Sequence, residues 1–124
     1  MKKVLITGGA TGIGKAAALL FKEKGYDVYI TYNKTAPDFS GITAVKCDLS
    51  ITADIERLFK TVQGIDVLVN NAGVSLIKMI NDTTAEDYET VMNVNARAVY
   101  FCCKYAAVQM LKKHSGAIVN ISSI

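Results

Sequence analysis

The chain has 124 residues, of which 51% are hydrophobic and 20% charged, and 14 basic against 11 acidic residues give a formal net charge of +3. These proportions are typical of a globular protein and exclude a disordered tail. The charged residues are scattered along the chain instead of gathered in one basic block. We therefore expect no nucleic-acid partner.

The N-terminal segment has two lysines and only a short apolar run before Gly8, too short for a signal-peptide core or a membrane span. We expect a cytoplasmic protein with no membrane partner. Cys47, Cys102 and Cys103 form no CxxC motif, so they are expected to be buried thiols. His114 is the single histidine, which excludes a multi-histidine metal site, and we predict no bound metal.

Short apolar runs alternate with helical patterns along the whole chain. Buried strands are predicted over residues 4–7, 27–32, 44–47, 65–71 and 117–122. Helices are predicted over 13–25, over 51–62, and from 84 to about 113, where the length suggests a division near 93–95. The segment 33–43 has Pro37 and Gly41 but no helical period, which predicts a loop between the second and third strands. This alternation indicates one α/β domain over residues 1–124, with a parallel sheet covered by helices.

The stretch TGGATGIG, from Thr7 to Gly14, joins the first predicted strand to the first predicted helix. Glycines at 8, 12 and 14 would let the backbone N–H groups at the start of the helix approach a pyrophosphate. The spacing differs from the GxGxxG fingerprint, and Ala16 after Lys15 excludes a Walker A loop. A glycine-rich turn without any ligand is the plain alternative.

Four further motifs follow in order: CDLS with Asp48, NNAG at 70–73, VMNVN with Asn95, and GAIVNISS with Ser123. Together with TGGATGIG they resemble the ordered motifs of the short-chain dehydrogenase/reductase family over essentially the whole chain. Taken alone, NNAG could be a strand-ending turn, Asn95 a helix break and the serine pair an ordinary strand end. The resemblance implies a doubly wound, Rossmann-like parallel sheet of order 3-2-1-4-5, with the cofactor where the order switches.

The resemblance also implies the site residues. Asn95 and Ser123 match the family's catalytic asparagine and serine, the first to hold a proton-relay water and the second to hydrogen-bond the substrate carbonyl. Asp48 matches the acid that contacts the adenine amino group. The cofactor-binding residues implied are Gly8, Thr11, Gly12, Ile13, Gly14, Tyr32, Asn33, Lys34, Asp48, Leu49, Asn71, Ala72 and Gly73.

The end of the second strand bears on the choice of cofactor. Members of the family that prefer NAD place an acidic residue there, where it repels a 2′-phosphate. Here the matching residues are Tyr32, Asn33 and Lys34, so NADP(H) is the preferred expectation, with NAD(H) possible. Thr11 stands where many NADP-dependent members carry a basic residue.

Within the family the chain most resembles bacterial 3-oxoacyl-acyl-carrier-protein reductases. This implies NADP(H)-dependent reduction of a 3-oxoacyl thioester by hydride transfer, in a homo-oligomer (a dimer or tetramer). The reductase of the 5-aminopentanone group on modified elongation factor P is a close alternative. A nucleotide-binding or interaction module without catalysis is the non-enzyme alternative, and NNAG disfavours a sugar-nucleotide epimerase.

The family's proton donor is a tyrosine in a YxxxK motif about a dozen residues after the serine, and this chain ends one residue after Ser123. Tyr100 and Lys104 spell YxxxK, but they precede the serine strand and are expected to be neighbours on one helix face. We therefore expect the N-terminal, cofactor-binding part of a longer reductase. Alone it would not catalyse carbonyl reduction, would bind cofactor weakly and would be poorly soluble. A YxxxK encoded shortly after Ile124 would favour this interpretation.

Overall fold

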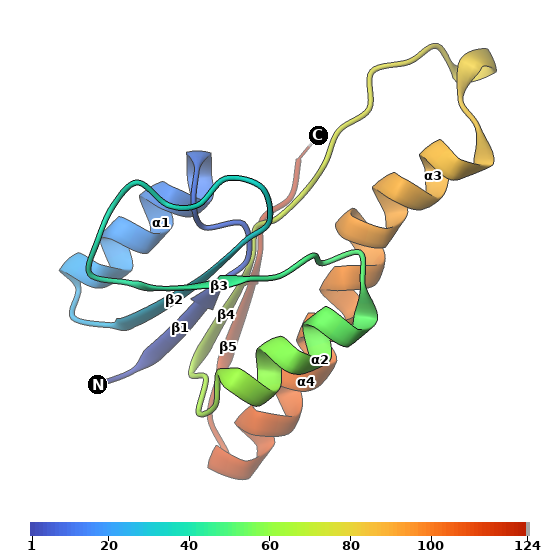
Figure 1. Ribbon diagram of the computed structural model, residues 1–124. Helices are drawn as coiled ribbons and strands as arrows, with labels where there is room; N and C mark the ends of the chain where they lie inside the picture. The colour runs from blue at the N-terminus through green and yellow to red at the C-terminus, as the bar shows by residue number, and fades with distance from the viewer. Residues whose placement is uncertain (124) are drawn as a thin grey trace.

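Five parallel strands form one sheet in the computed structural model, which describes residues 1–123. The strands are β1 (Lys3–Ile6), β2 (Asp27–Tyr32), β3 (Thr43–Lys46), β4 (Val67–Asn70) and β5 (Ala117–Asn120), and the helices are α1 (Gly12–Glu23), α2 (Thr52–Thr61), α3 (Ala85–Met92) and α4 (Ala98–Lys113). The spatial order is β3-β2-β1-β4-β5, and all four pairings are parallel (Figure 1). The predicted fold class and strand order are confirmed.

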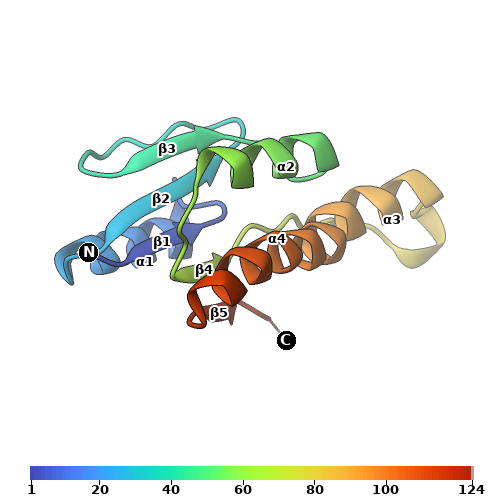
Figure 2. The ribbon, with the colours of Figure 1, turned by 90° about the horizontal axis from the view of Figure 1, so that it is seen from below.

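Helices pack on both faces of the sheet. Helices α2 and α4 lie side by side on one face, and α1 covers the other (Figure 2). Strand β1 lies between them: Leu5 packs into the α2 and α4 core, whereas Val4 and Ile6 pack into the α1 core. Since both faces of this strand are buried, its residues 4–6 are all apolar, as in other parallel sheets.

Strand β5 differs from the central strands because it forms an edge of the sheet and, within residues 1–123, pairs only with β4. Ile118 is 39% exposed and Val119 44% exposed, whereas Val4, Leu5 and Ile6 are fully buried. The expected covering of the sheet on both faces therefore holds at its centre and not at this edge.

The long helical stretch begins at a capping box. The Asp87 N–H donates to Thr84 Oγ1 (3.0 Å), and the Thr84 N–H donates to Asp87 Oδ2 (3.0 Å). The predicted division near 93–95 is confirmed in position: α3 ends at Met92, and a π turn, η2 (Asn93–Arg97), connects it to α4 without a non-helical break. In Figure 1, α3 and α4 run on as one rod. The extra residue of a π turn shifts the hydrogen-bond register without ending the helix.

The connections also position the site. The segment from Asn33 to Ile42 forms no helix, as predicted, and a short 3₁₀ turn, η1 (Ile80–Asp82), lies in the connection from β4 to α3. In Figure 1 that connection projects away from the sheet.

Within residues 1–123, no helix combines the length and apolar character needed to cross a membrane.

The three cysteines are free thiols. Cys47 and Cys102 are buried as expected, whereas Cys103 is half-buried and its Sγ accepts a hydrogen bond from Asn70 Nδ2 (3.3 Å). Burial raises the pKa of Cys47 and of Cys102 to about 12. Both thiols are therefore protonated near neutral pH and are poor nucleophiles.

Candidate cofactor-binding site

The glycine loop joins the carboxyl end of β1 to the start of α1. Gly8 and Gly12 adopt positive φ angles of 63° and 57°, a region that favours glycine. Thr11 is the N-cap residue of α1, and within residues 1–123 its side chain makes no capping hydrogen bond. The first turn of α1 also contains no acidic residue. The first N–H groups of α1 are thus available to an anion, at the positive end of the helix dipole.

Gly12 and Gly14 serve different purposes in this loop. A Cβ built on Gly12 would meet no other described atom within 4 Å, so the space beside it is open. A Cβ on the buried Gly14 would lie 2.3 Å from the Gly8 carbonyl oxygen and 2.4 Å from Asn71 Nδ2. Gly14 therefore lets α1 pack against the ends of β1 and β4, while Gly12 leaves room for a ligand.

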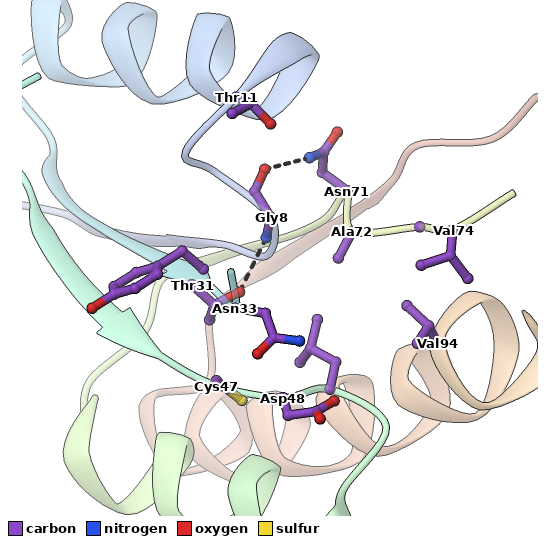
Figure 3. A pocket seen from close by; sticks show the side chains of 13 residues that line it. Gly8, Thr11, Thr31, Asn33, Cys47, Asp48, Asn71, Ala72, Val74 and Val94 are labelled. Atoms are coloured by element: carbon purple, nitrogen blue, oxygen red, sulfur yellow. Dashed lines mark hydrogen bonds between the residues drawn. The ribbon is translucent and has the colours of Figure 1, made fainter. Parts of the chain in front are cut away.

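Neutral polar side chains fix the loop to the neighbouring strands. Asn71 Nδ2 donates to the carbonyl oxygens of Thr7 (3.1 Å) and Gly8 (3.0 Å). Thr7 Oγ1 accepts from the N–H groups of Asn71 and Ala72, both at 3.0 Å. Thr31 Oγ1, on β2, accepts from the Gly8 N–H (3.0 Å; Figure 3). Sequence reasoning missed Thr7 and Thr31 as positioning residues, because a buried threonine in a strand or just after one gives no distinctive pattern.

A groove of about 290 Å³ opens beside this loop, at the carboxyl ends of the strands (Figure 3). Nine of the predicted cofactor-binding residues line it: Gly8, Thr11, Tyr32, Asn33, Asp48, Leu49, Asn71, Ala72 and Gly73. Thr31, Cys47, Val74 and Val94 also line it and were not predicted. Lys34 borders an adjoining hollow, and Gly12 a second one. Ile13 lies at the start of α1 with 66% of its surface exposed, and Gly14 is buried behind the loop.

Asp48 is held in place at the floor of the groove. Its Oδ1 accepts from the Ser50 N–H (3.0 Å) and from Ser50 Oγ (2.7 Å), whereas Oδ2 takes no part in these bonds. The Asp48 N–H donates to Asp54 Oδ2 (2.9 Å). That bond and one from Arg57 hold the pKa of the Asp54 carboxyl below its usual value. Ser50 and Asp54 therefore orient Asp48, with one carboxylate oxygen left for a donor on a ligand.

The predicted catalytic residues lie outside the groove lining. Asn95, in the π turn, clamps Val74: its Oδ1 accepts from the Val74 N–H (2.8 Å), and its Nδ2 donates to the Val74 carbonyl oxygen (2.7 Å). The Asn95 side chain is thus already engaged by backbone, and its role toward a relay water stays a prediction. Ser123 lies three residues beyond β5 and is exposed, and its role also stays a prediction.

The YxxxK pair on α4 is arranged as expected for helix neighbours. Tyr100 is 69% exposed, and its ring packs edge-on against Phe101 with 5.3 Å between centroids. Lys104 Nζ lies 5.4 Å from the ring centroid of Tyr105. Neither residue is among those that line the groove in the described part of the chain.

Comparison with known proteins places this geometry in a family. The family model described as short chain dehydrogenase matches residues 2–124. An uncharacterized oxidoreductase of Thermotoga maritima is 36% identical over 98% of this chain and 53% of its own length. A 3-oxoacyl-[acyl-carrier-protein] reductase of Synechocystis is 32% identical over 97% of this chain and 55% of its own length.

A solved structure extends the comparison to three dimensions. The short-chain dehydrogenase from Sphingobium yanoikuyae, in complex with NADPH, superposes with a TM-score of 0.88 at 26% identity and covers 100% of this chain. This chain covers 54% of that protein and thus spans about half the length of the relatives it matches. By its family model, its relatives and its strand order, the chain belongs to the short-chain dehydrogenase/reductase family.

Proposed function

We propose that this chain is the cofactor-binding part of an NADP(H)-dependent oxidoreductase that reduces a carbonyl group, of the 3-oxoacyl thioester type, to an alcohol. The observation that carries the proposal is the uncapped start of α1 beside Gly8 and Gly12, opening on a groove with Asp48 at its floor. The oxidoreductase class follows from the family, and the likeness to a 3-oxoacyl-[acyl-carrier-protein] reductase supports the substrate class.

The residues present fit a dinucleotide. The open space beside Gly12 and the N–H groups of α1 would take the pyrophosphate. Oδ2 of Asp48 would accept from the adenine amino group, because Ser50 engages only Oδ1. Ala72 and Gly73, at the end of β4, would form the wall beyond the loop. A side chain at Gly14 would push Gly8 and Asn71 out of this arrangement.

The preference for NADP(H) is supported by what stands at the end of β2. Tyr32 and Asn33 line the groove, and Lys34 borders the hollow next to it, so no carboxylate occupies the position that selects NAD in the family. The related Sphingobium enzyme was solved with NADPH, which agrees with this preference.

When bound, the reduced cofactor supplies a hydride to the carbonyl carbon, and the carbonyl oxygen then needs a proton. Asn95 and Ser123 are poor acids near neutral pH, and the phenol of Tyr100 lies on α4 away from the groove lining. We therefore assign none of these three as the proton donor. Ser123 would hydrogen-bond the carbonyl oxygen and orient it.

The test is a fluorescence titration of the purified chain with NADPH and with NADH. We expect tighter binding of NADPH, and about three- to tenfold weaker binding of both cofactors to Asp48→Asn, because an amide accepts more weakly than a carboxylate. Asp82→Asn, an exposed change in η1, is the matched control and should bind like the wild type. Tighter binding of NADH would overturn the cofactor preference, and absence of binding would overturn the site.

Activity separates the substrate proposal from the cofactor proposal. NADPH oxidation is followed with a 3-oxoacyl thioester and with unrelated ketones, and the thioester should be the better substrate of the active protein. Reduction by the 124-residue chain that is lost on Tyr100→Phe would show that Tyr100 is the proton donor after all. Preference for an unrelated ketone would overturn the substrate class and leave the cofactor site intact.

We also propose that the protein forms a homo-oligomer through α4 and that it lies in the cytoplasm. Helix α4 exposes Tyr100, Val108 and Leu111, with Leu111 71% exposed, and we propose that this face lies in a homo-oligomer. Light scattering after size-exclusion chromatography tests it, and a monomer at high concentration would contradict it. Three free thiols suit a reducing, cytoplasmic compartment.

A further inference from the structure

A series of hollows leads from the cofactor groove to Lys15. The groove and the adjoining hollow share Thr11 and Tyr32, and that hollow shares Thr11 and Thr35 with a third one of about 250 Å³. The third hollow lies between the glycine loop and the segment 33–42, and Lys15 and Asp38 form part of its wall. A group projecting from a nucleotide in the groove, past the end of β2, would therefore meet this hollow.

Lys15 stands one helical turn after Thr11. The Lys15 N–H donates to the Thr11 carbonyl oxygen (3.1 Å), and side chains four residues apart share one face of a helix. Helical side chains also point back toward the N-terminus, which directs Lys15 toward the level of Thr11. Lys15 thus supplies a positive charge beside Thr11, and both residues line the third hollow. The sequence analysis had looked for a basic residue at position 11 itself.

The ammonium of Lys15 has a competing partner. Nζ lies 2.8 Å from Asp38 Oδ1 and 5.5 Å from the ring centroid of Phe39. The Lys15 side chain is 34% exposed and that of Asp38 75% exposed. An ion pair so accessible to water is weak and is readily exchanged for a more highly charged anion such as a phosphate.

The segment that carries Asp38 has a second attachment to α1. Lys22 Nζ donates to the Ser40 carbonyl oxygen (2.9 Å), and Phe39 and Ile42 pack against the core on the α1 face. The segment therefore stays in place when the Lys15 ion pair opens. Lys22 supplies a matched control, since it ties the same segment to the same helix and lines none of the three hollows.

We propose that Lys15 is the residue that selects for the 2′-phosphate of NADP(H), and that Asp38 is the counter-ion that this phosphate must displace. The inference rests on the proposed function, because it needs a nucleotide in the groove. Asp38 has two effects in this arrangement: it holds the Lys15 ammonium at the hollow, and its negative charge opposes an incoming phosphate. Because the exposed ion pair positions the ammonium only weakly, the repulsion should outweigh the positioning, and removing the Asp38 charge should strengthen the preference for a 2′-phosphate.

The test uses two nucleotides that differ only in the group of interest, adenosine 2′,5′-bisphosphate and adenosine 5′-monophosphate. Isothermal titration calorimetry of the 124-residue chain gives the affinity for each. Lys15→Met keeps the length of the side chain, and we expect it to weaken bisphosphate binding about tenfold and to leave monophosphate binding unchanged. Lys22→Met should change neither affinity. Asp38→Asn should tighten bisphosphate binding about two- to fivefold and leave the monophosphate unchanged.

The outcomes separate this inference from the proposed function. If Lys15→Met leaves the ratio of the two affinities at its wild-type value, Lys15 does not select the 2′-phosphate, while monophosphate binding would still support the nucleotide site. If Lys15→Met and Lys22→Met weaken bisphosphate binding equally, Lys15 only anchors the segment, which also overturns the inference. If the wild type binds neither nucleotide, both the proposed function and this inference fail. Circular dichroism and thermal unfolding confirm that each variant is folded.

Discussion

The amino ends and the carboxyl ends of the five parallel strands lie on opposite sides of the sheet and are covered by different contacts. We call the amino side the closed edge and the carboxyl side the open edge. At the amino edge, the Lys3 N–H donates to Asp66 Oδ2 (2.8 Å), and Asp66 also pairs with Lys113. Next to it, the buried Gln109 side chain bonds the chain that leads from α2 into β4. At the carboxyl edge, neutral side chains tie the loop at Gly8, but the N–H groups at the start of α1 stay open. The closed edge stabilises the fold, and the open edge is available for binding.

Gln109→Leu should produce the largest loss of stability, at the closed edge. Gln109 Oε1 accepts from the Ile65 N–H (3.1 Å), and its Nε2 donates to the carbonyl oxygens of Phe59 (3.1 Å) and Val62 (3.0 Å). Leucine would remove the partner of the buried Ile65 N–H and Val62 carbonyl oxygen and leave the Phe59 carbonyl oxygen to Gln63, so we expect the free energy of unfolding to fall by about 3 kcal/mol. Urea denaturation measures it.

Gln63→Leu is the matched control for Gln109→Leu. Gln63 also donates to the Phe59 carbonyl oxygen, but it is exposed, so its loss should change stability by no more than about 0.5 kcal/mol. Nucleotide affinity of the folded fraction should stay at the wild-type value in both variants. Equal effects of the two substitutions would show that the buried amide contributes no more than a surface one.

Gly14→Ala acts at the open edge and should affect both properties. The new Cβ would lie 2.3 Å from the Gly8 carbonyl oxygen, so the loop must move, at a cost of about 2 kcal/mol in stability. Because Gly8 lines the groove, we also expect about tenfold weaker binding of nucleotide. Denaturation and calorimetry measure the two effects.

Gly64→Ala, at the closed edge, is the control for Gly14→Ala. Gly64 has a positive φ of 72°, and a Cβ there meets no described atom within 4 Å. It should lose about 1 kcal/mol through backbone strain alone and keep its nucleotide affinity. If Gly14→Ala binds nucleotide as the wild type does, the close approach of α1 to Gly8 is not needed for the site.

Thr31→Val should give a smaller effect. Valine has nearly the same shape, but it removes the acceptor for the Gly8 N–H at a residue that is 1% exposed. We expect a loss of about 1 kcal/mol by thermal or urea unfolding, together with weaker nucleotide binding. Thr61→Val is the exposed control, since Thr61 Oγ1 donates to the Arg57 carbonyl oxygen at the surface. It should change neither stability nor nucleotide binding appreciably. Equal losses in both would contradict the proposed role of Thr31.

The ion pair at Asp66 should give the smallest effect, and one that depends on pH. Hydrogen bonds from Lys113 and from the Lys3 N–H hold the pKa of the Asp66 carboxyl below its usual value. A carboxyl with a lowered folded-state pKa stabilises the fold above its unfolded-state pKa, near 4, and this contribution is lost as the pH falls through the folded-state pKa. We expect less than about 1 kcal/mol, because the pair is partly exposed.

Urea unfolding of the wild type and of Asp66→Asn at neutral and acidic pH measures this contribution. The difference between the two proteins should shrink as the pH falls. Asp82→Asn, on the exposed η1 turn, serves as the control. A difference that stays constant with pH would show that the Asp66 charge does not act through this pair.

Much of the fold was predictable because it depends on local patterns. Apolar runs alternating with helical periods gave the number of strands, and Pro37 with Gly41 marked a connection without a helix. The glycine spacing indicated a loop that approaches a ligand, and the structure gives its glycines positive φ angles at 8 and 12. These features depend on neighbouring residues, which a sequence displays directly.

The features that were missed depend on contacts between distant residues. Gln109 reads as a surface residue on a helix, yet it is buried against residues more than 40 positions earlier in the chain. Lys15 and Asp38 are 23 residues apart, and no pattern relates them. The π turn escaped prediction because one extra residue within a five-residue segment barely alters the helical period.

The clamp between Asn95 and Val74 has a consequence for how this protein can vary. Two hydrogen bonds join the Asn95 side chain to the Val74 backbone. The residues between these positions therefore form a long connection whose two ends are held together. Lengthening such a connection adds only a small entropic cost and transmits little strain to the ends that the hydrogen bonds hold. Insertions between Ser75 and Thr83 can thus remodel the exposed surface of Ile77, Met79 and Ile80 without moving Val74 in the groove wall.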